Sequence, residues 1–139
     1  MEKRWAMPSR KNLSKELDVR GLQWLAARFL RILKVQGAAV DIFLAPHREM
    51  AALKRHFFKK YSEPNVISFP EPAHFPHPET KKRYLGEIYL NRDLLKKNPS
   101  RTEPLLLHGI LHLLGYDHEK DADAAKMEHK EAKIMKRLR

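Results

Sequence analysis

The sequence contains no cysteine, so its fold cannot depend on a disulfide, which fits a reducing compartment. No apolar run approaches the roughly 20 residues that a membrane-spanning helix needs. Residues 1–18 are basic and lack the apolar stretch of about 7–15 residues typical of a secretory signal. We therefore expect a cytoplasmic protein with no membrane partner.

Acidic residues are also scarce, with 17 Asp and Glu against 28 Lys and Arg, which gives a net charge of +11. Such a charge favours a polyanionic partner, although charge alone also fits a merely basic protein. The apolar content of 42% is ordinary for a globular chain. At 139 residues, we expect one domain over residues 1–139, with 1–18 as a flexible basic arm.

Apolar periodicity and breaker residues predict several short elements. Thr102 is a candidate N-cap for the helix that contains residues 108–112. Prolines and the lack of a period predict an exposed loop over 71–83. Helices mixed with at least three strands indicate an α+β fold. The predicted helices span 19–35, 46–61, 102–114 and 121–138, and the predicted strands span 38–45, 65–69 and 84–90.

The stretch HGILHLLGYDH, residues 108–118, carries the strongest chemical signal. His108 and His112 are four residues apart, so both rings project from one helical face and can converge on one metal ion. A continuing helix would point His118 away from that face. Gly115 can adopt the left-handed conformation that ends a helix and turns the chain back. We therefore predict that His108, His112 and His118 bind one metal ion.

Three imidazoles with an open fourth position are typical of catalytic zinc, so we expect one Zn²⁺ per chain, although other divalent transition metals also bind imidazole. A water bound there would be activated at neutral pH, which indicates hydrolysis. Zinc proteases with this histidine spacing place a glutamate directly after the first histidine as general base. Gly109 occupies that position, so peptide hydrolysis is the weaker alternative.

Other polar residues have plainer interpretations. Asp117 is expected to orient a ligand or cap the turn. Glu131 lies on the apolar stripe of the last helix and should form a buried or half-buried ion pair, while Met127 should pack in the core. The histidines outside the motif are expected at the surface: His47, His56, His74, His77 and His129.

The histidine motif resembles the signature of the YbeY family, bacterial metal-dependent endoribonucleases of ribosomal RNA maturation. The segments NVISFP (65–70), LGEIYL (85–90) and MEHKEAKIM (127–135) also resemble family segments, so the likeness extends from about residue 50 to the end. The resemblance implies a small mixed β-sheet with helices packed on it. It also implies a zincin-like zinc site on a central helix and the turn after it.

The chain departs from the family pattern ahead of residue 66 and again at residue 87. The family carries an arginine associated with RNA binding or cleavage, whereas the corresponding stretch here is FFKKYSEPN. Lys59 or Lys60 could replace its charge, but not its bidentate grip on phosphate. Asn65 stands where the family has aspartate, and Glu87 where its strand has another aspartate.

Roles for these residues are hypotheses. Lys59 and Lys60 would neutralise phosphate charge, and Glu87 is a candidate base or a surface ion pair. The substrate-binding candidates are Asn65, Ser68 and Phe69, with a plain core role as the alternative for Phe69.

Three functions remain open. The favoured one is a single-strand-specific metal-dependent endoribonuclease in rRNA processing and ribosome biogenesis, with RNA rather than DNA as partner. The second is a non-catalytic RNA-binding factor of ribosome assembly whose metal is structural. The third is a zinc metalloprotease.

Overall fold

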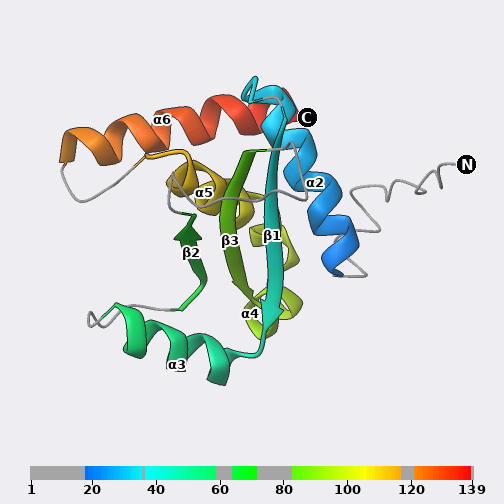
Figure 1. Ribbon diagram of the computed structural model, residues 1–139, viewed down its shortest axis with the longest axis vertical. Coiled ribbons are helices and arrows are strands. Elements are labelled where there is room, and N and C mark those ends of the chain that lie inside the picture. Colours follow the sequence, from blue (N-terminus) through cyan, green and yellow to red (C-terminus); the bar gives the residue numbers. More distant parts are fainter. Residues whose placement is uncertain (1–17, 36, 59–63, 72–82, 117–120, 139) are drawn as a thin grey trace, which may run out of the picture.

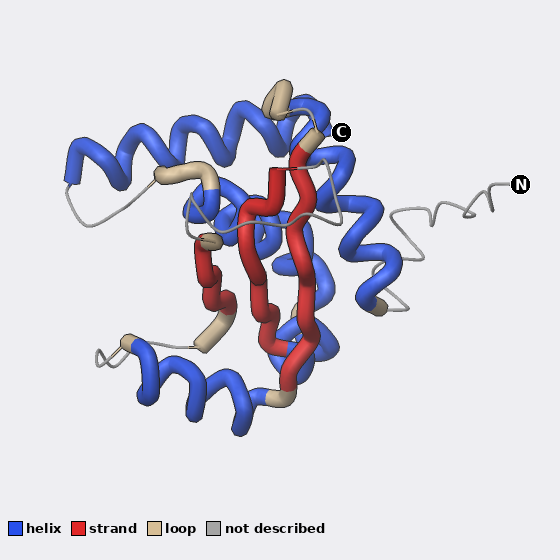
Figure 2. Tube along the Cα trace, in the orientation of Figure 1, coloured by secondary structure: helices blue, strands red, loops and turns tan. Residues whose placement is uncertain are grey.

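The computed structural model describes residues 18–35, 37–58, 64–71, 83–116 and 121–138 (Figure 1). Three strands and several helices alternate along these ranges, and Figure 2 shows how the helices surround the strands. The elements are α2 (Val19–Ile32), β1 (Ala38–Ala45), α3 (His47–Phe57), β2 (Val66–Pro70), β3 (Arg83–Asn91), α4 (Arg92–Lys97), the 3₁₀ helix η1 (Pro99–Arg101), α5 (Thr102–Leu113) and α6 (Asp121–Leu138).

The sheet is small and mixed, in the order β1-β3-β2. Strand β1 runs parallel to the central strand β3, and β2 runs antiparallel to it. The register of β1 and β3 shifts between Ala39 and Val40, where β3 carries one extra residue beside Gly86. The expected α+β fold with helices packed on a small mixed sheet is confirmed.

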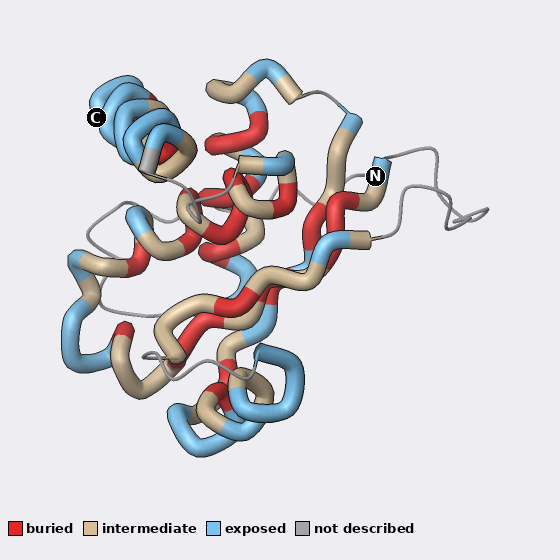
Figure 3. The backbone as a smooth tube through the Cα atoms, turned by 90° about the vertical axis from the view of Figure 1, so that its left-hand side faces the viewer, coloured by how far each residue is buried: buried red, intermediate tan, exposed pale blue. Residues whose placement is uncertain are grey.

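Helix α5 lies at the centre of the main core. Its side chains Leu106, Leu107, Ile110 and Leu111 are fully buried in one cluster with residues of the sheet, α2 and α6. The buried segments of the chain gather where these elements meet, and much of the outer surface of α6 is exposed (Figure 3). A second, smaller cluster of Ala45, Met50 and Ile67 joins α3 to the sheet.

Alternation along the strands separates two sheet faces. Ile88 and Leu90 of β3 point into the main core with α5, whereas Tyr89 packs against the second cluster beside α3. Helix α3 covers only one end of that second face (Figure 1). The residues next to α5 and those on the other face therefore belong to different environments.

Several element boundaries differ from the sequence-based expectations. Helix α2 ends before Gly37 because Lys34 adopts a left-handed conformation (φ 61°) and the Val35 N–H bonds to the Leu30 carbonyl. Asp18, assigned to the arm, instead caps α2 by accepting the Gly21 N–H at 2.7 Å.

Near the central helix, one prediction is wrong and one helix was missed. Thr102 is the first residue of α5 and already has helical dihedral angles, so it is not the N-cap; the chain enters through η1 instead. Helix α4 was not predicted at all. Its signal is Asn91, whose side chain accepts the Leu94 N–H at 3.0 Å and is 1% exposed.

The last helix, residues 121–138, is confirmed as α6, with Met127, Ile134 and Leu138 buried as its apolar stripe. None of the helices in the described ranges has the length and apolar character required to cross a bilayer. Residues 1–17 lie outside the description, so the single-domain assignment and the basic arm stay predictions.

Candidate metal centre

Helix α5 holds His108 and His112 side by side. Their Nε2 atoms are 3.1 Å apart, and their ring planes meet at 78°. Two ligands at 2.0–2.1 Å from a tetrahedral zinc ion would be separated by about 3.3 Å. The two imidazoles therefore fit a shared metal ion, as their i, i+4 spacing predicts.

A carboxylate from α6 supports the first histidine. Glu131 Oε1 lies 3.0 Å from His108 Nδ1, and the two side chains are 24% and 28% exposed. A carboxylate can only accept a hydrogen bond, so this contact keeps a proton on Nδ1 and leaves the Nε2 lone pair for a metal. Glu131 is half-buried and has a polar partner, as predicted, but with a neutral His108 the contact is a hydrogen bond to a candidate metal ligand rather than an ion pair.

Gly115 ends α5 in the manner the motif predicts. Its φ is +101°, and its N–H bonds to the His112 carbonyl at 3.0 Å. The next N–H, of Tyr116, bonds to the Leu111 carbonyl at 3.0 Å, and the Tyr116 side chain packs against the main core. These contacts form a Schellman motif, which turns the chain away from the helix axis directly after the second histidine.

The third predicted ligand, His118, lies outside the described residues, as does Asp117. Within the ranges that can be described, no group of three or more His, Cys, Asp or Glu residues is arranged to hold a metal ion. The donor chemistry and spacing of His108 and His112 fit zinc, and the three-histidine site stays a prediction.

Gly109 directly follows His108 on α5, and its Cα atom faces the sheet. A Cβ atom there would approach Ile88 Cγ2 at 3.0 Å and Ser68 Oγ at 3.1 Å. The fully buried Ile88 leaves no room for a longer side chain. A glutamate side chain at this position would therefore crowd Ile88 and Ser68.

Two substrate-binding candidates lie on opposite faces of β2. The Ser68 hydroxyl donates to the Gly109 carbonyl at 3.1 Å, so it fastens β2 to α5 one residue from His108. Phe69 points to the other face and packs beside Tyr89. The backbone carbonyl of Asn65 accepts the Asn91 N–H at 3.0 Å.

Of the three catalytic candidates, Glu87 alone belongs to the described residues, and it is not beside the histidines. Lys59 and Lys60 lie outside the described residues. Glu87 is the neighbour of Ile88 on β3, so its side chain points to the face opposite α5. The pKa of Tyr89 is raised, first by burial and then by the nearby charge of Glu87. The carboxylate of Glu87 also accepts a hydrogen bond from the Tyr89 hydroxyl. In this arrangement Glu87 interacts with the tyrosine rather than with His108 or His112.

The chain is similar to a known protein family and to several named members of it. The sequence profile described as Endoribonuclease YbeY matches residues 9–139. A protein named Endoribonuclease YbeY from Syntrophotalea carbinolica is 30% identical over 139 residues, covering 91% of this chain and 90% of the relative. One of the same name from Legionella pneumophila is 35% identical over 113 residues, covering 74% and 70%.

A third relative of that name, from Anaeromyxobacter dehalogenans, is 34% identical over 123 residues. That alignment covers 83% of this chain but 62% of the relative, so the chain spans about three fifths of the relative's length. The profile match extends over all the described elements, including the helix with both histidines and the helix with Glu131. The chain belongs to the YbeY family.

Proposed function

We propose that this protein is a metal-dependent endoribonuclease that cleaves single-stranded RNA during ribosomal RNA maturation. The proposal depends on one observation: the Nε2 atoms of His108 and His112 lie 3.1 Å apart, and Glu131 is hydrogen-bonded to His108. The family to which the chain belongs is described as endoribonucleases. The net charge of +11 supports an RNA partner. Action on the ribosome in the cytoplasm is part of the same proposal.

His108, His112 and His118 would hold one Zn²⁺. When bound, zinc would polarise a phosphoryl oxygen and lower the pKa of a water molecule. Glu131 orients the His108 ring and holds the proton on its Nδ1 atom. The Ser68 hydroxyl links β2 to α5 through its hydrogen bond to the Gly109 carbonyl.

The remaining candidates would act on the substrate. Lys59 and Lys60 follow α3 in the chain and would neutralise phosphate charge near the scissile bond. Asn65 and Phe69 would contact nucleotides along β2. Glu87 is a weaker candidate for the base, since its side chain is directed to the face opposite α5.

A second function, RNA binding in ribosome assembly without cleavage, is favoured by one feature. The stretch FFKKYSEPN has lysines but no arginine, and lysine lacks the fork that grips phosphate with two hydrogen bonds. In that case the metal would be structural. A protease is disfavoured because Gly109 packs tightly against Ile88.

The test is cleavage of single-stranded RNA and of casein by purified protein, with and without a chelator. We expect RNA cutting that chelator abolishes, no casein cutting, and loss of RNA cutting in His112→Ala. The matched control is His129→Ala, which removes an exposed histidine of α6. Cutting that persists in His112→Ala would indicate contaminating ribonuclease, and tight RNA binding without cutting would support the assembly factor.

A further inference from the structure

A row of aromatic side chains crosses the sheet face opposite α5. Phe43 of β1 stacks on Tyr89 of β3, with ring centroids 4.8 Å apart. Tyr89 meets Phe69 of β2 edge to face at 5.6 Å. Phe69 then contacts two rings at the end of α3, Phe57 at 5.1 Å and Phe58 at 6.0 Å. We call these five residues the aromatic row.

The ends of the aromatic row are exposed to solvent. Phe57 is 56% exposed, Phe58 42% and Phe43 39%, and the other large apolar side chain exposed to this degree in the described ranges is Val19. Clustered exposed aromatic rings, unlike a single exposed apolar residue, indicate a binding surface. Packing against Phe69 holds Phe57 and Phe58 in place, so little side-chain entropy would be lost on binding.

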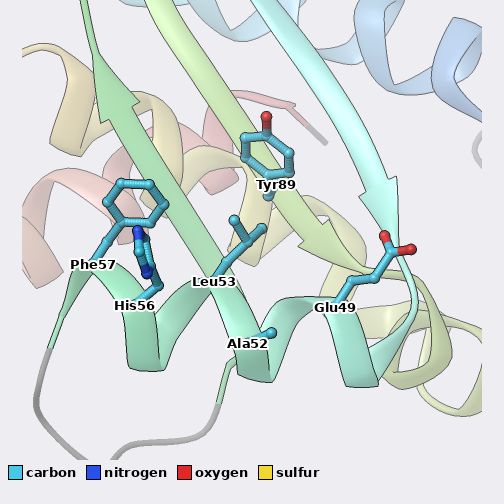
Figure 4. A pocket seen from close by; sticks show the side chains of 6 residues that line it. All are labelled: Glu49, Ala52, Leu53, His56, Phe57 and Tyr89. Atoms are coloured by element: carbon cyan, nitrogen blue, oxygen red, sulfur yellow. The ribbon is translucent and has the colours of Figure 1, made fainter.

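An open hollow lies beside the row, between α3 and β3 (Figure 4). Leu53 and Phe57 reach from α3 toward the sheet, and Tyr89 faces them from β3. Glu49 and His56 lie at the two ends of the hollow. The hollow therefore has an apolar floor with an acidic end and a basic end.

Charge distinguishes one end of the aromatic row from its middle. The last turn of α3 carries Lys54, Arg55 and His56, directly beside Phe57. Glu87 interacts with Tyr89 in the middle of the row. An anionic ligand is therefore favoured at the end formed by Phe57 and Phe58, where His56 meets Phe57 edge to face at 4.7 Å and exposed Arg55 belongs to the same helical turn.

Exposed rings beside basic side chains are the combination that binds unpaired nucleic acid strands, with bases on the rings and phosphates on the cations. We propose that Phe57 and Phe58 form a stacking platform for bases of single-stranded RNA, with Arg55 contacting the adjacent phosphate. This inference rests on the proposed function, because it names how the same protein would hold its substrate. Strand β2 joins the platform to the histidine helix, since Phe69 supports the rings and Ser68 bonds to Gly109.

The experiment measures binding of a fluorescent single-stranded RNA of about 12 nucleotides by anisotropy, with chelator present so that no cleavage occurs. We expect Phe58→Ala and Phe57→Ala each to weaken binding by about tenfold, the effect of losing one stacked base. Phe58→Tyr should keep wild-type affinity because it keeps the ring. Phe58→Leu should bind as weakly as Phe58→Ala, since it is apolar but cannot stack. Val19→Ala is the matched control for loss of an exposed apolar side chain and should bind like wild type.

A second arm uses duplex RNA of the same sequence. Its bases are paired and stacked on each other, so Phe58→Ala should leave duplex affinity unchanged, whereas Arg55→Gln should weaken single-strand binding. Equal single-strand affinity of wild type, Phe58→Ala and Phe58→Leu would overturn the platform and leave the aromatic row as a surface for a protein partner. Because binding is measured without metal, loss of stacking is detected even if the protein proves unable to cleave RNA.

Discussion

At the scale of single residues, the environment of His108 is the most informative feature. Its Nδ1 atom faces Glu131 and its Nε2 atom faces His112, so one ring connects α6 to the candidate metal centre. A histidine that only filled space in the core would not need a carboxylate on one nitrogen and an imidazole on the other. The contact with Glu131 fixes the orientation of the ring, as it would need to be fixed for the proposed metal.

Replacing Glu131 tests this orientation directly. Glu131→Gln should weaken zinc affinity by about 10–100-fold, because the amide is a poorer acceptor for the Nδ1 proton than the carboxylate. Zinc binding is measured by calorimetry or by competition with a chromogenic chelator. Glu128→Gln, one turn earlier on the exposed side of α6, removes the same charge and should leave the affinity unchanged. Equal losses in both variants would show a general charge effect instead.

At the scale of elements, β3 depends on a glycine that allows β2 to approach. Gly86 has a φ of +138°, and a Cβ atom there would lie 2.2 Å from the Phe69 carbonyl oxygen and 2.9 Å from Pro70 Cα. These are backbone atoms of the neighbouring strand, so they cannot move aside as the end of a flexible side chain can. The pairing of β2 with β3 therefore requires glycine at this position.

Gly86→Ala should lower the free energy of unfolding by about 3 kcal/mol or more, through backbone strain and the loss of strand pairing. Denaturant unfolding followed by circular dichroism measures the change. Gly37→Ala is the matched control, since Gly37 also has a positive φ, +66°, but its Cβ would meet no described atom within 4 Å. That variant should cost only about 1–2 kcal/mol. Equal losses in the free energy of unfolding for Gly86→Ala and Gly37→Ala would contradict the requirement for glycine at position 86.

Helix α3 receives its N-terminal cap from another element. Pro46 provides no side-chain cap, and the His47 N–H instead donates to Asp93 Oδ2 of α4 at 2.8 Å. This hydrogen bond, with the nearby Arg92 charge, holds the pKa of Asp93 below its ordinary value of 3.8. A carboxylate with a lowered pKa stabilises the folded state above the unfolded-state pKa and loses that effect as the pH falls through the folded-state pKa.

Asp93→Ala should therefore lower the melting temperature at pH 7, and the difference from wild type should shrink below about pH 4. Thermal melts at pH 7, 5 and 3 measure it. Asp93→Asn keeps an acceptor oxygen without the titrating charge, so it should retain much of the cap and show a weaker pH dependence than wild type. A melting temperature of Asp93→Ala equal to wild type at pH 7 would contradict the cap.

At the scale of the whole molecule, the net charge of +11 would control how strongly the protein attracts the proposed RNA substrate. Charge attracts any nucleic acid, whereas the exposed rings of Phe57 and Phe58 favour unpaired bases. Attraction would therefore come from cations such as Arg55, and selectivity from the rings that follow them in the chain.

Binding to single-stranded RNA should depend strongly on salt. For about four phosphate contacts, the affinity should fall by about 50-fold between 50 and 200 mM salt, since each contact contributes about −0.7 to the slope of log K against log salt. Arg55→Gln should make the slope shallower by about 0.7, while Lys136→Gln, on the exposed surface of α6, should not change it. A slope near zero for wild type would show that charge contributes little to binding.

Much of the fold was predictable because the periodicity of apolar residues is a local property. The three strands and helices α2, α3, α5 and α6 all appear where the pattern places them, with shifted ends. Helix α4 was not predicted because its six residues are too few to show a helical period of apolar residues. Its sequence signal is the N-cap Asn91. Thr102 was misassigned because a preceding 3₁₀ turn, which has no apolar pattern, supplies the helix entry.

The sequence by itself determined the histidine pair and the turn after it, since i, i+4 spacing and a left-handed glycine act within a few residues of one another. Only the tertiary structure decided what surrounds them. Glu131 lies 23 positions from His108, and the rings of Phe43, Phe69 and Phe57 come from three separate elements. Contacts between residues so far apart in the sequence depend on how helices and strands pack, and no local spacing of residues specifies that packing.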